Sequence, residues 1–80
     1  MTRIVLADDH AIVREGLKRI VAEAADFQVV GEAADGTEVM QAVRELEFDV
    51  LVLDLSMPGR SGMELIKLVK SEKPKLRILV

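Results

Sequence analysis

The 80-residue chain contains no cysteine, tryptophan or tyrosine, and it has only two phenylalanines and two prolines. The lack of cysteine excludes disulfide bonds and thiolate metal sites. No apolar run approaches the roughly 18 residues of a membrane span, so we expect no membrane contact. The net charge of -3 and the lack of a basic run with interleaved aromatic residues argue against a nucleic-acid surface on this chain.

Strand and helix patterns alternate along the sequence, which indicates one α/β domain with a parallel sheet. We expect strands over residues 3–7, 28–33, 49–53 and 76–80, and helices over 11–24, from 35 onward, and from 61 to just before Pro74. The second strand carries polar residues and therefore suits a sheet edge. No signal-peptide pattern precedes the first strand, so a soluble cytoplasmic domain is expected.

Apolar residues at helical spacing predict the buried side of each helix. The first helix should bury Val13, Leu17, Ile20, Val21 and Ala24. The second should bury Val39, Met40, Val43 and Leu46, and the third Met63, Ile66, Leu68 and Val69. Asp9 or His10 is expected to cap the first helix, whose solvated side should carry Arg14 and Lys18. Ser61 and Glu64 form a capping-box pattern.

The most informative feature is that two apolar runs each end in acids. Residues 3–7 are followed by Asp8 and Asp9, and residues 50–53 by Asp54. Such runs are typical of parallel strands buried on both faces, and ligands bind beyond the carboxyl ends of these strands. A single aspartate there is usually a helix cap, but three acids after two such strands favour a binding site. Carboxylates held this close repel each other unless a cation lies among them, and oxygen ligands suit Mg2+.

Two nearby features have both a plain and a functional interpretation. The segment 57–62 predicts a tight strand-to-helix loop. Beside Asp54 it would also form a wall of the acidic crevice, where the backbone carbonyl of Ser56 is a candidate neutral metal ligand. His10 is either a metal ligand or base, or a polar residue of the first helical turn, and we favour the second interpretation. The sequence contains no glycine-rich phosphate loop and no Ser/His/Asp nucleophile set.

Three motifs together resemble the receiver domain of bacterial two-component response regulators: Leu6-Ala7-Asp8-Asp9-His10, Val52-Leu53-Asp54-Leu55-Ser56-Met57-Pro58 and Gly62. The stretch 9–17 further resembles the subfamily that carries a C-terminal helix-turn-helix output domain. The resemblance covers the whole chain. It implies a flavodoxin-like (receiver-like) three-layer fold with a parallel sheet in the order 2-1-3-4. It also implies that residues 1–80 are the N-terminal portion of such a domain, without its fifth strand and last two helices.

The resemblance also implies a role for each acid. Asp54 would be the phosphoacceptor, which takes a phosphoryl group from a phosphohistidine on a sensor histidine kinase. The side chains of Asp9 and Asp54 and the carbonyl of Ser56 would hold Mg2+, and Asp8 would support the site, partly through water. Such a domain promotes its own phosphorylation and is not a conventional enzyme. The longer parent protein would regulate transcription.

One departure from the family pattern leaves alternatives open. Family members carry a Ser or Thr after the fourth strand and a Lys after the fifth, and Val80 precedes both positions. We therefore expect impaired phosphorylation. One alternative is a non-signalling, self-associating fragment whose acidic site is vestigial. A second is an aspartyl-phosphate hydrolase, but these enzymes typically need a second acid where this chain has Ser56.

The expected strand order also predicts an uncovered surface. Right-handed crossovers place the first helix alone on one sheet face and the other two on the opposite face. One helix cannot cover four strands, so apolar residues of the third and fourth strands should stay exposed. Depending on strand register, the candidates are Leu51, Leu53, Ile78 and Val80. The fourth strand would also be an open edge. We therefore expect a homo-oligomer joined through the fourth strand and this uncovered face.

Overall fold

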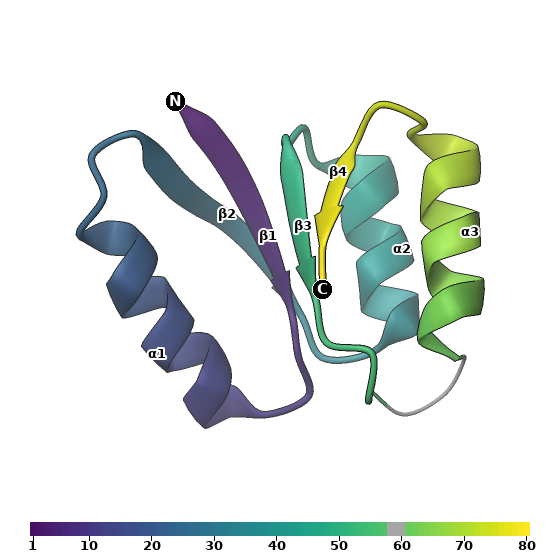
Figure 1. The fold of residues 1–80 in the computed structure, drawn as a ribbon, viewed down its shortest axis with the longest axis horizontal. Helices are drawn as coiled ribbons and strands as arrows, with labels where there is room; N and C mark the ends of the chain where they lie inside the picture. The colour runs from purple at the N-terminus through teal and green to yellow at the C-terminus, as the bar shows by residue number, and fades with distance from the viewer. Residues whose placement is uncertain (58–60) are drawn as a thin grey trace.

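The computed structural model describes residues 1–57 and 61–80. In these residues the elements follow the order β1 (Thr2–Ala7), α1 (Ala11–Ala22), β2 (Phe27–Ala33), α2 (Gly36–Glu45), β3 (Val50–Leu53), α3 (Gly62–Glu72) and β4 (Arg77–Leu79). The described strands form one parallel sheet in the order β2-β1-β3-β4, with α1 on one face and α2 and α3 side by side on the other (Figure 1). This arrangement confirms the expected flavodoxin-like topology, with β2 at one edge. Residues 58–60 of the expected loop lie outside the described part.

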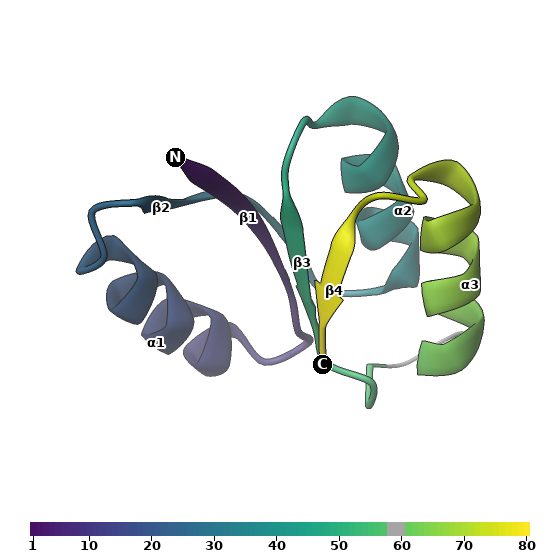
Figure 2. The same cartoon turned by 45° about the horizontal axis from the view of Figure 1, so that its top comes forward.

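The main core lies between the sheet and the α2–α3 layer (Figure 2). Alternate residues of a strand point to the same face. Val5 and Leu51 therefore point together toward Val39 and Val69, and all four side chains are 0% exposed. This register excludes three of the candidates for the uncovered face, namely Leu51, Leu53 and Ile78. Leu51 and Leu53 belong to this core and Ile78 packs against it.

Local capping explains where α2 and α3 begin. The carboxylate of Asp35 accepts a 2.8 Å hydrogen bond from the amide of Glu38, and the hydroxyl of Ser61 accepts a 3.2 Å bond from the amide of Glu64. Both caps satisfy amides that have no partner within their helix. The prediction that Met63 lies on the buried side of α3 is wrong, since Met63 is 62% exposed. Leu65 is buried instead.

The orientation of α1 differs from the expectation. None of its residues, all of which are described, is buried, and Val13 and Ile20 are 43% and 67% exposed. The basic side of α1 faces β2 instead. The Arg14 Nε lies 3.1 Å from Glu32 Oε1, and the Lys18 Nζ lies 3.0 Å from Glu32 Oε2. Residues 14 and 18 share one side of a helix, so binding both to Glu32 turns Val13 and Ile20 toward solvent.

α1 also ends two residues earlier than predicted. The amides of Glu23 and Ala24 donate to the carbonyls of Ile20 and Val21, at 3.3 Å and 3.0 Å. These bonds span three residues, so the last turn is tighter than an α-helix, as is common at helix ends. Ala24 therefore lies beyond the helix rather than on its inner side.

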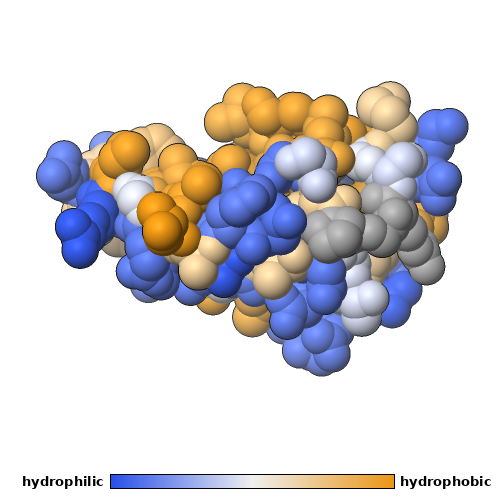
Figure 3. Space-filling view, turned by 90° about the horizontal axis from the view of Figure 1, so that it is seen from below, coloured by the Kyte–Doolittle hydropathy of each residue, from blue (hydrophilic) through white to orange (hydrophobic). Residues whose placement is uncertain are grey.

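The α1 face of the sheet is only partly covered. Leu79 in β4 is 62% exposed and points to this face, because it alternates with Ile78 along the strand. Val80 is also exposed, at 68%, but it follows β4 and alternates with Leu79, so its predicted place on the uncovered face stays a prediction. Seen from below, hydrophobic surface gathers over α1 at the left and, more extensively, along the upper edge of the view (Figure 3). No helix in the described residues is long and apolar enough to cross a membrane.

Candidate functional site

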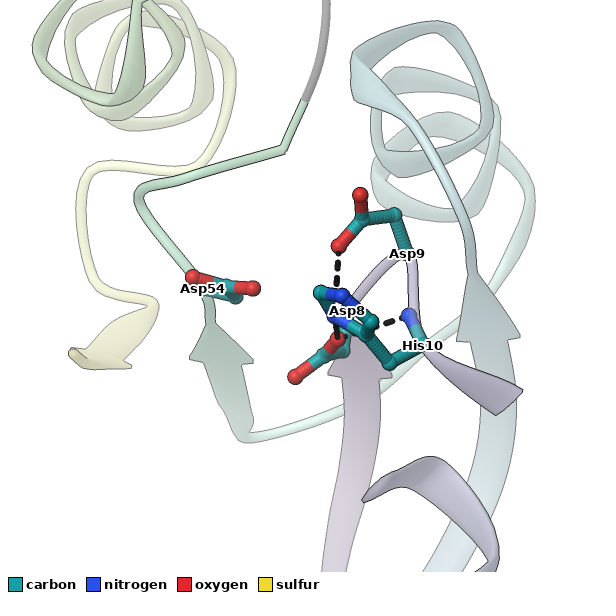
Figure 4. Close-up of side chains that lie close together, drawn as sticks. All are labelled: Asp8, Asp9, His10 and Asp54. Atoms are coloured by element: carbon teal, nitrogen blue, oxygen red, sulfur yellow. Dashed lines mark hydrogen bonds and ion pairs between the residues drawn. The ribbon is translucent and has the colours of Figure 1, made fainter. Parts of the chain in front are cut away.

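The pairing of β1 with β3 brings the predicted acids together. The two strands are parallel and place Ala7 opposite Leu53, so the residues after them are neighbours. The amide of Asp54 donates to the carbonyl of Ala7 at 2.9 Å, which extends the ladder one residue beyond β3. Asp8, Asp9, His10 and Asp54 each offer one ligand atom, and these atoms all lie within 4.8 Å of one another (Figure 4).

Asp8 and Asp9 form one half of the site. The Asp8 side chain is only 13% exposed, and its Oδ1 accepts a 2.8 Å hydrogen bond from the backbone amide of His10. The guanidinium of Arg14 donates to the backbone carbonyl of Asp8. The Asp9 side chain is 29% exposed and more open to solvent. Asp8 is therefore the better anchored of the two acids, and Asp9 is the more accessible.

Asp54 forms the other half of the site. Its Oδ1 accepts hydrogen bonds from the amide of Ser56 at 2.9 Å and from the hydroxyl of Ser56 at 2.7 Å. These bonds, the amide bond first, hold the pKa of Asp54 below its ordinary value, and the nearby His10 charge acts in the same direction. The carboxylate is therefore ionised at neutral pH. The predicted role of the Ser56 carbonyl concerns a different atom and stays a prediction.

His10 belongs to the cluster, although the sequence interpretation favoured a polar residue of the first helical turn. It is the N-cap residue of α1, and its Nδ1 lies 3.1 Å from Asp8 Oδ1 and 2.9 Å from Asp9 Oδ1. The hydrogen bond to Asp8, followed by the charge of Asp9, raises the pKa of His10. Its position directly after two strand-end acids was the available signal.

The donor set fits a divalent cation. Three carboxylates converge from two strands, and hard cations take such oxygen ligands. A separate hollow of about 860 Å3 lies at the other end of the sheet, where β1, β3 and β4 begin. It is lined among others by Arg3, Phe48 and Lys73. It contains none of the clustered acids, so we place the chemistry at the carboxyl ends of β1 and β3.

Comparison with known proteins agrees with this geometry. A family model described as the response regulator receiver domain matches residues 4–80. The oxygen regulatory protein NreC of Staphylococcus epidermidis is 47% identical over 79 residues, which are 98% of this chain and 36% of that protein. The uncharacterized transcriptional regulatory protein YhcZ of Bacillus subtilis is 42% identical over 78 residues, with the same coverage of 98% and 36%.

Solved structures share the fold as well. RcsB of Salmonella enterica serovar Typhimurium, bound to promoter rprA with the phosphomimetic BeF3-, has a TM-score of 0.91 and 37% identity over 98% of this chain and 66% of that one. The response regulator domain of Thermotoga maritima CheB has a TM-score of 0.90 and 37% identity, over 98% of this chain and 57% of that one. The chain spans about a third of the length of the two curated relatives. Because the family model covers nearly all of the sequence, this chain belongs to the response regulator receiver domain family.

Proposed function

We propose that the chain accepts a phosphoryl group on Asp54 from a phosphohistidine of a sensor histidine kinase. The observation that carries this proposal is the position of Asp54 at the carboxyl end of β3, next to Asp8 and Asp9 and with a lowered pKa. A nucleophilic carboxylate must be ionised, and the two hydrogen bonds from Ser56 stabilise that form.

The transfer requires one bond to form and one to break. A carboxylate oxygen of Asp54 attacks the phosphorus, the P–N bond to the donor imidazole breaks, and the imidazole nitrogen keeps the electron pair and takes a proton from solvent. Among the described residues, both hydrogen bonds to Asp54 fall on Oδ1. Oδ2 is therefore the oxygen that we assign to the attack.

The same acids would hold Mg2+. We assign the ion to the side chains of Asp9 and Asp54 and the carbonyl of Ser56, with Asp8 in support through water. When bound, the ion neutralises charge on the phosphoryl group in transit, which is the main need of this chemistry. Asp8 contributes by fixing the backbone of His10, and so the chain that carries Asp9.

The relatives suggest the setting of this reaction. Two of them are named as regulatory proteins, and one structure was solved on promoter DNA. We therefore propose that residues 1–80 are the N-terminal portion of the receiver domain of a cytoplasmic transcription regulator. A helix-turn-helix domain would bind the DNA, and this chain would not contact it directly.

Phosphorylation with a small donor tests the assignment. The chain is incubated with acetyl phosphate and Mg2+, and intact mass spectrometry is expected to show one added phosphoryl group, which Asp54→Asn abolishes. Labelling should be slow, because residues 1–80 contain neither the hydroxyl nor the lysine that grips the phosphoryl oxygens in the family. Such donors each contribute on the order of a hundredfold in rate. Equal labelling of Asp54→Asn would overturn the assignment.

A second candidate function rests on the exposed surface of β4. Leu79 and Val80 are largely exposed, and β4 is the last strand of the described sheet. An open strand edge beside apolar side chains favours pairing with a second copy of the chain. In this alternative the fragment associates with itself and the acidic site is vestigial. Failure of the wild-type chain to be labelled, together with dimerisation, would support it.

A further inference from the structure

We propose that His10 is a nitrogen ligand of the acidic site, which would give the chain a preference for borderline divalent ions such as Co2+ and Zn2+ over Mg2+. This inference rests on the proposed function in one respect, namely that Asp9 and Asp54 hold a metal ion. It adds a residue, and a consequence for metal choice, that the carboxylates alone do not supply.

The first argument is the direction of the imidazole. His10 Nδ1 lies 2.9 Å from Asp9 Oδ1 and 3.1 Å from Asp8 Oδ1, so this nitrogen faces the same space as the carboxylates (Figure 4). Two ligand atoms that each lie about 2.1 Å from the same ion are at most about 4.2 Å apart. The four ligand atoms of the cluster lie within 4.8 Å of one another, so a small side-chain rotation brings them onto one ion.

The second argument is that His10 is able to make this rotation. Its side chain is 65% exposed. It also makes no cap hydrogen bond with α1 in the described structure. Its backbone, in contrast, is fixed, because the amide donates to Asp8 Oδ1 at 2.8 Å. The imidazole is thus attached at a fixed point beside the acids, and it can turn onto an ion by exchanging its contacts with Asp8 and Asp9 for the metal.

The third argument is chemical. Mg2+ takes oxygen ligands and keeps several of its waters, so a nearby imidazole adds little to its binding. Co2+ and Zn2+ accept imidazole nitrogen readily, and their affinity rises with each such ligand. The preference for one metal over another is the difference between the two binding free energies. A residue that strengthens the binding of Co2+ and Zn2+ but not of Mg2+ therefore shifts the preference toward Co2+ and Zn2+.

The test compares two metals in matched variants of the whole 80-residue chain. Binding of Co2+ and of Mg2+ is measured by calorimetry at about pH 8.5, well above the ordinary histidine pKa. The variant His10→Asn keeps a good N-cap residue but removes the imidazole. We expect its Co2+ affinity to fall about tenfold or more while its Mg2+ affinity stays nearly constant. Circular dichroism confirms that the variant is folded.

A direct readout accompanies the affinities. In the wild-type chain, Zn2+ should shift the 15N resonance of His10 Nδ1, whereas Mg2+ should leave it in place. Affinities for Co2+ and Mg2+ that change in parallel in His10→Asn, or an Nδ1 resonance that ignores Zn2+, would overturn the proposal.

The variant Asp54→Asn separates this inference from the proposed function. It should weaken the binding of both metals. If both metals bind Asp54→Asn as well as they bind the wild type, the metal site itself is wrong and the His10 proposal fails with it. If Asp54→Asn weakens both metals but His10→Asn leaves their ratio unchanged, only the role of His10 is refuted.

Discussion

Gly62 provides a sharp test of how tightly α3 packs against the segment after Asp54. A Cβ added at Gly62 would lie 3.0 Å from Leu55 Cβ and 3.1 Å from Leu55 Cα. The second atom belongs to the backbone, so no side-chain rotation relieves the contact. Gly62→Ala must therefore displace either the start of α3 or the backbone beside Asp54.

The expected magnitude follows from a comparison of two glycines. Gly62 begins α3, whereas Gly16 lies within α1, where an added Cβ would meet nothing within 4 Å beyond the backbone of its own helix. Alanine in place of a helical glycine stabilises by about 0.4–1 kcal/mol when it meets no obstacle. Overpacking costs about 1–3 kcal/mol. Gly16→Ala should therefore be stabilised, and Gly62→Ala should be less stable than Gly16→Ala by about 1–3 kcal/mol.

Urea unfolding monitored by circular dichroism measures both variants, and the slope of the transition reports whether the folded state stays compact. Where the substitution displaces the backbone at Leu55, next to Asp54, Mg2+ binding should also weaken in Gly62→Ala. The reasoning is refuted if Gly62→Ala is as stable as Gly16→Ala and binds Mg2+ like the wild type.

Three further predictions concern α1, the core and β4. Lys18 and then Arg14 lower the pKa of Glu32. The ionised Glu32 therefore stabilises the fold above the ordinary glutamate pKa, and this contribution is lost as the pH falls through the lowered pKa. In Glu32→Gln, the free energy of unfolding measured in urea should fall less between about pH 5 and pH 3 than it does in the wild type. Leu51→Ala, at a side chain 0% exposed, should lower the free energy of unfolding by about 2–5 kcal/mol. Leu79→Lys should weaken self-association in sedimentation velocity, because it places a charge on the exposed end of β4.

Each of these predictions has a control or a contrary outcome. The control for Glu32 is Glu15→Gln, because the Glu15 carboxylate also contacts Lys18, at 2.7 Å, but its side chain is 64% exposed. In this control the free energy of unfolding should fall with acid as it does in the wild type. Leu55→Ala, at a 42% exposed side chain, should cost far less than Leu51→Ala, and equal losses would contradict the assignment of the core. A wild-type chain that is monomeric at tens of micromolar would contradict the association through β4.

The sheet and the acids were predictable because buried parallel strands have a strong sequence signature. The runs before Asp8 and Asp54 are almost wholly apolar, and both strands lie in the middle of the described sheet. The cap at Ser61 was equally visible, since the capping-box pattern is local. The resemblance supplied the strand order, which the apolar pattern alone leaves open.

The orientation of α1 was not predictable because it depends on a β-bulge. The pairing of β1 with β2 shifts after Val29, so that Gly31 lies opposite Val5 and Glu32 opposite Leu6. Without this shift, Glu32 would point to the other face, toward the core. The bulge presents Glu32 to the basic side of α1. No short-range pattern reveals a register shift, and the helical spacing of α1 was therefore misread.

The attachment of α1 has a consequence for the dynamics of the chain. α1 is joined to the sheet largely through Glu32 and the half-buried Leu17 and Val21, whereas α2 and α3 contribute fully buried side chains to the core. Regions with little buried apolar contact open first, so amide hydrogens of α1 should exchange with solvent well before those of β3 and α2. Asp9 and His10 lie at the start of this early-opening unit, whereas Asp54 follows β3, whose Leu51 and Leu53 belong to the core. A cation that joins the two halves would couple the opening of α1 to the rest of the domain and slow the exchange of its amides.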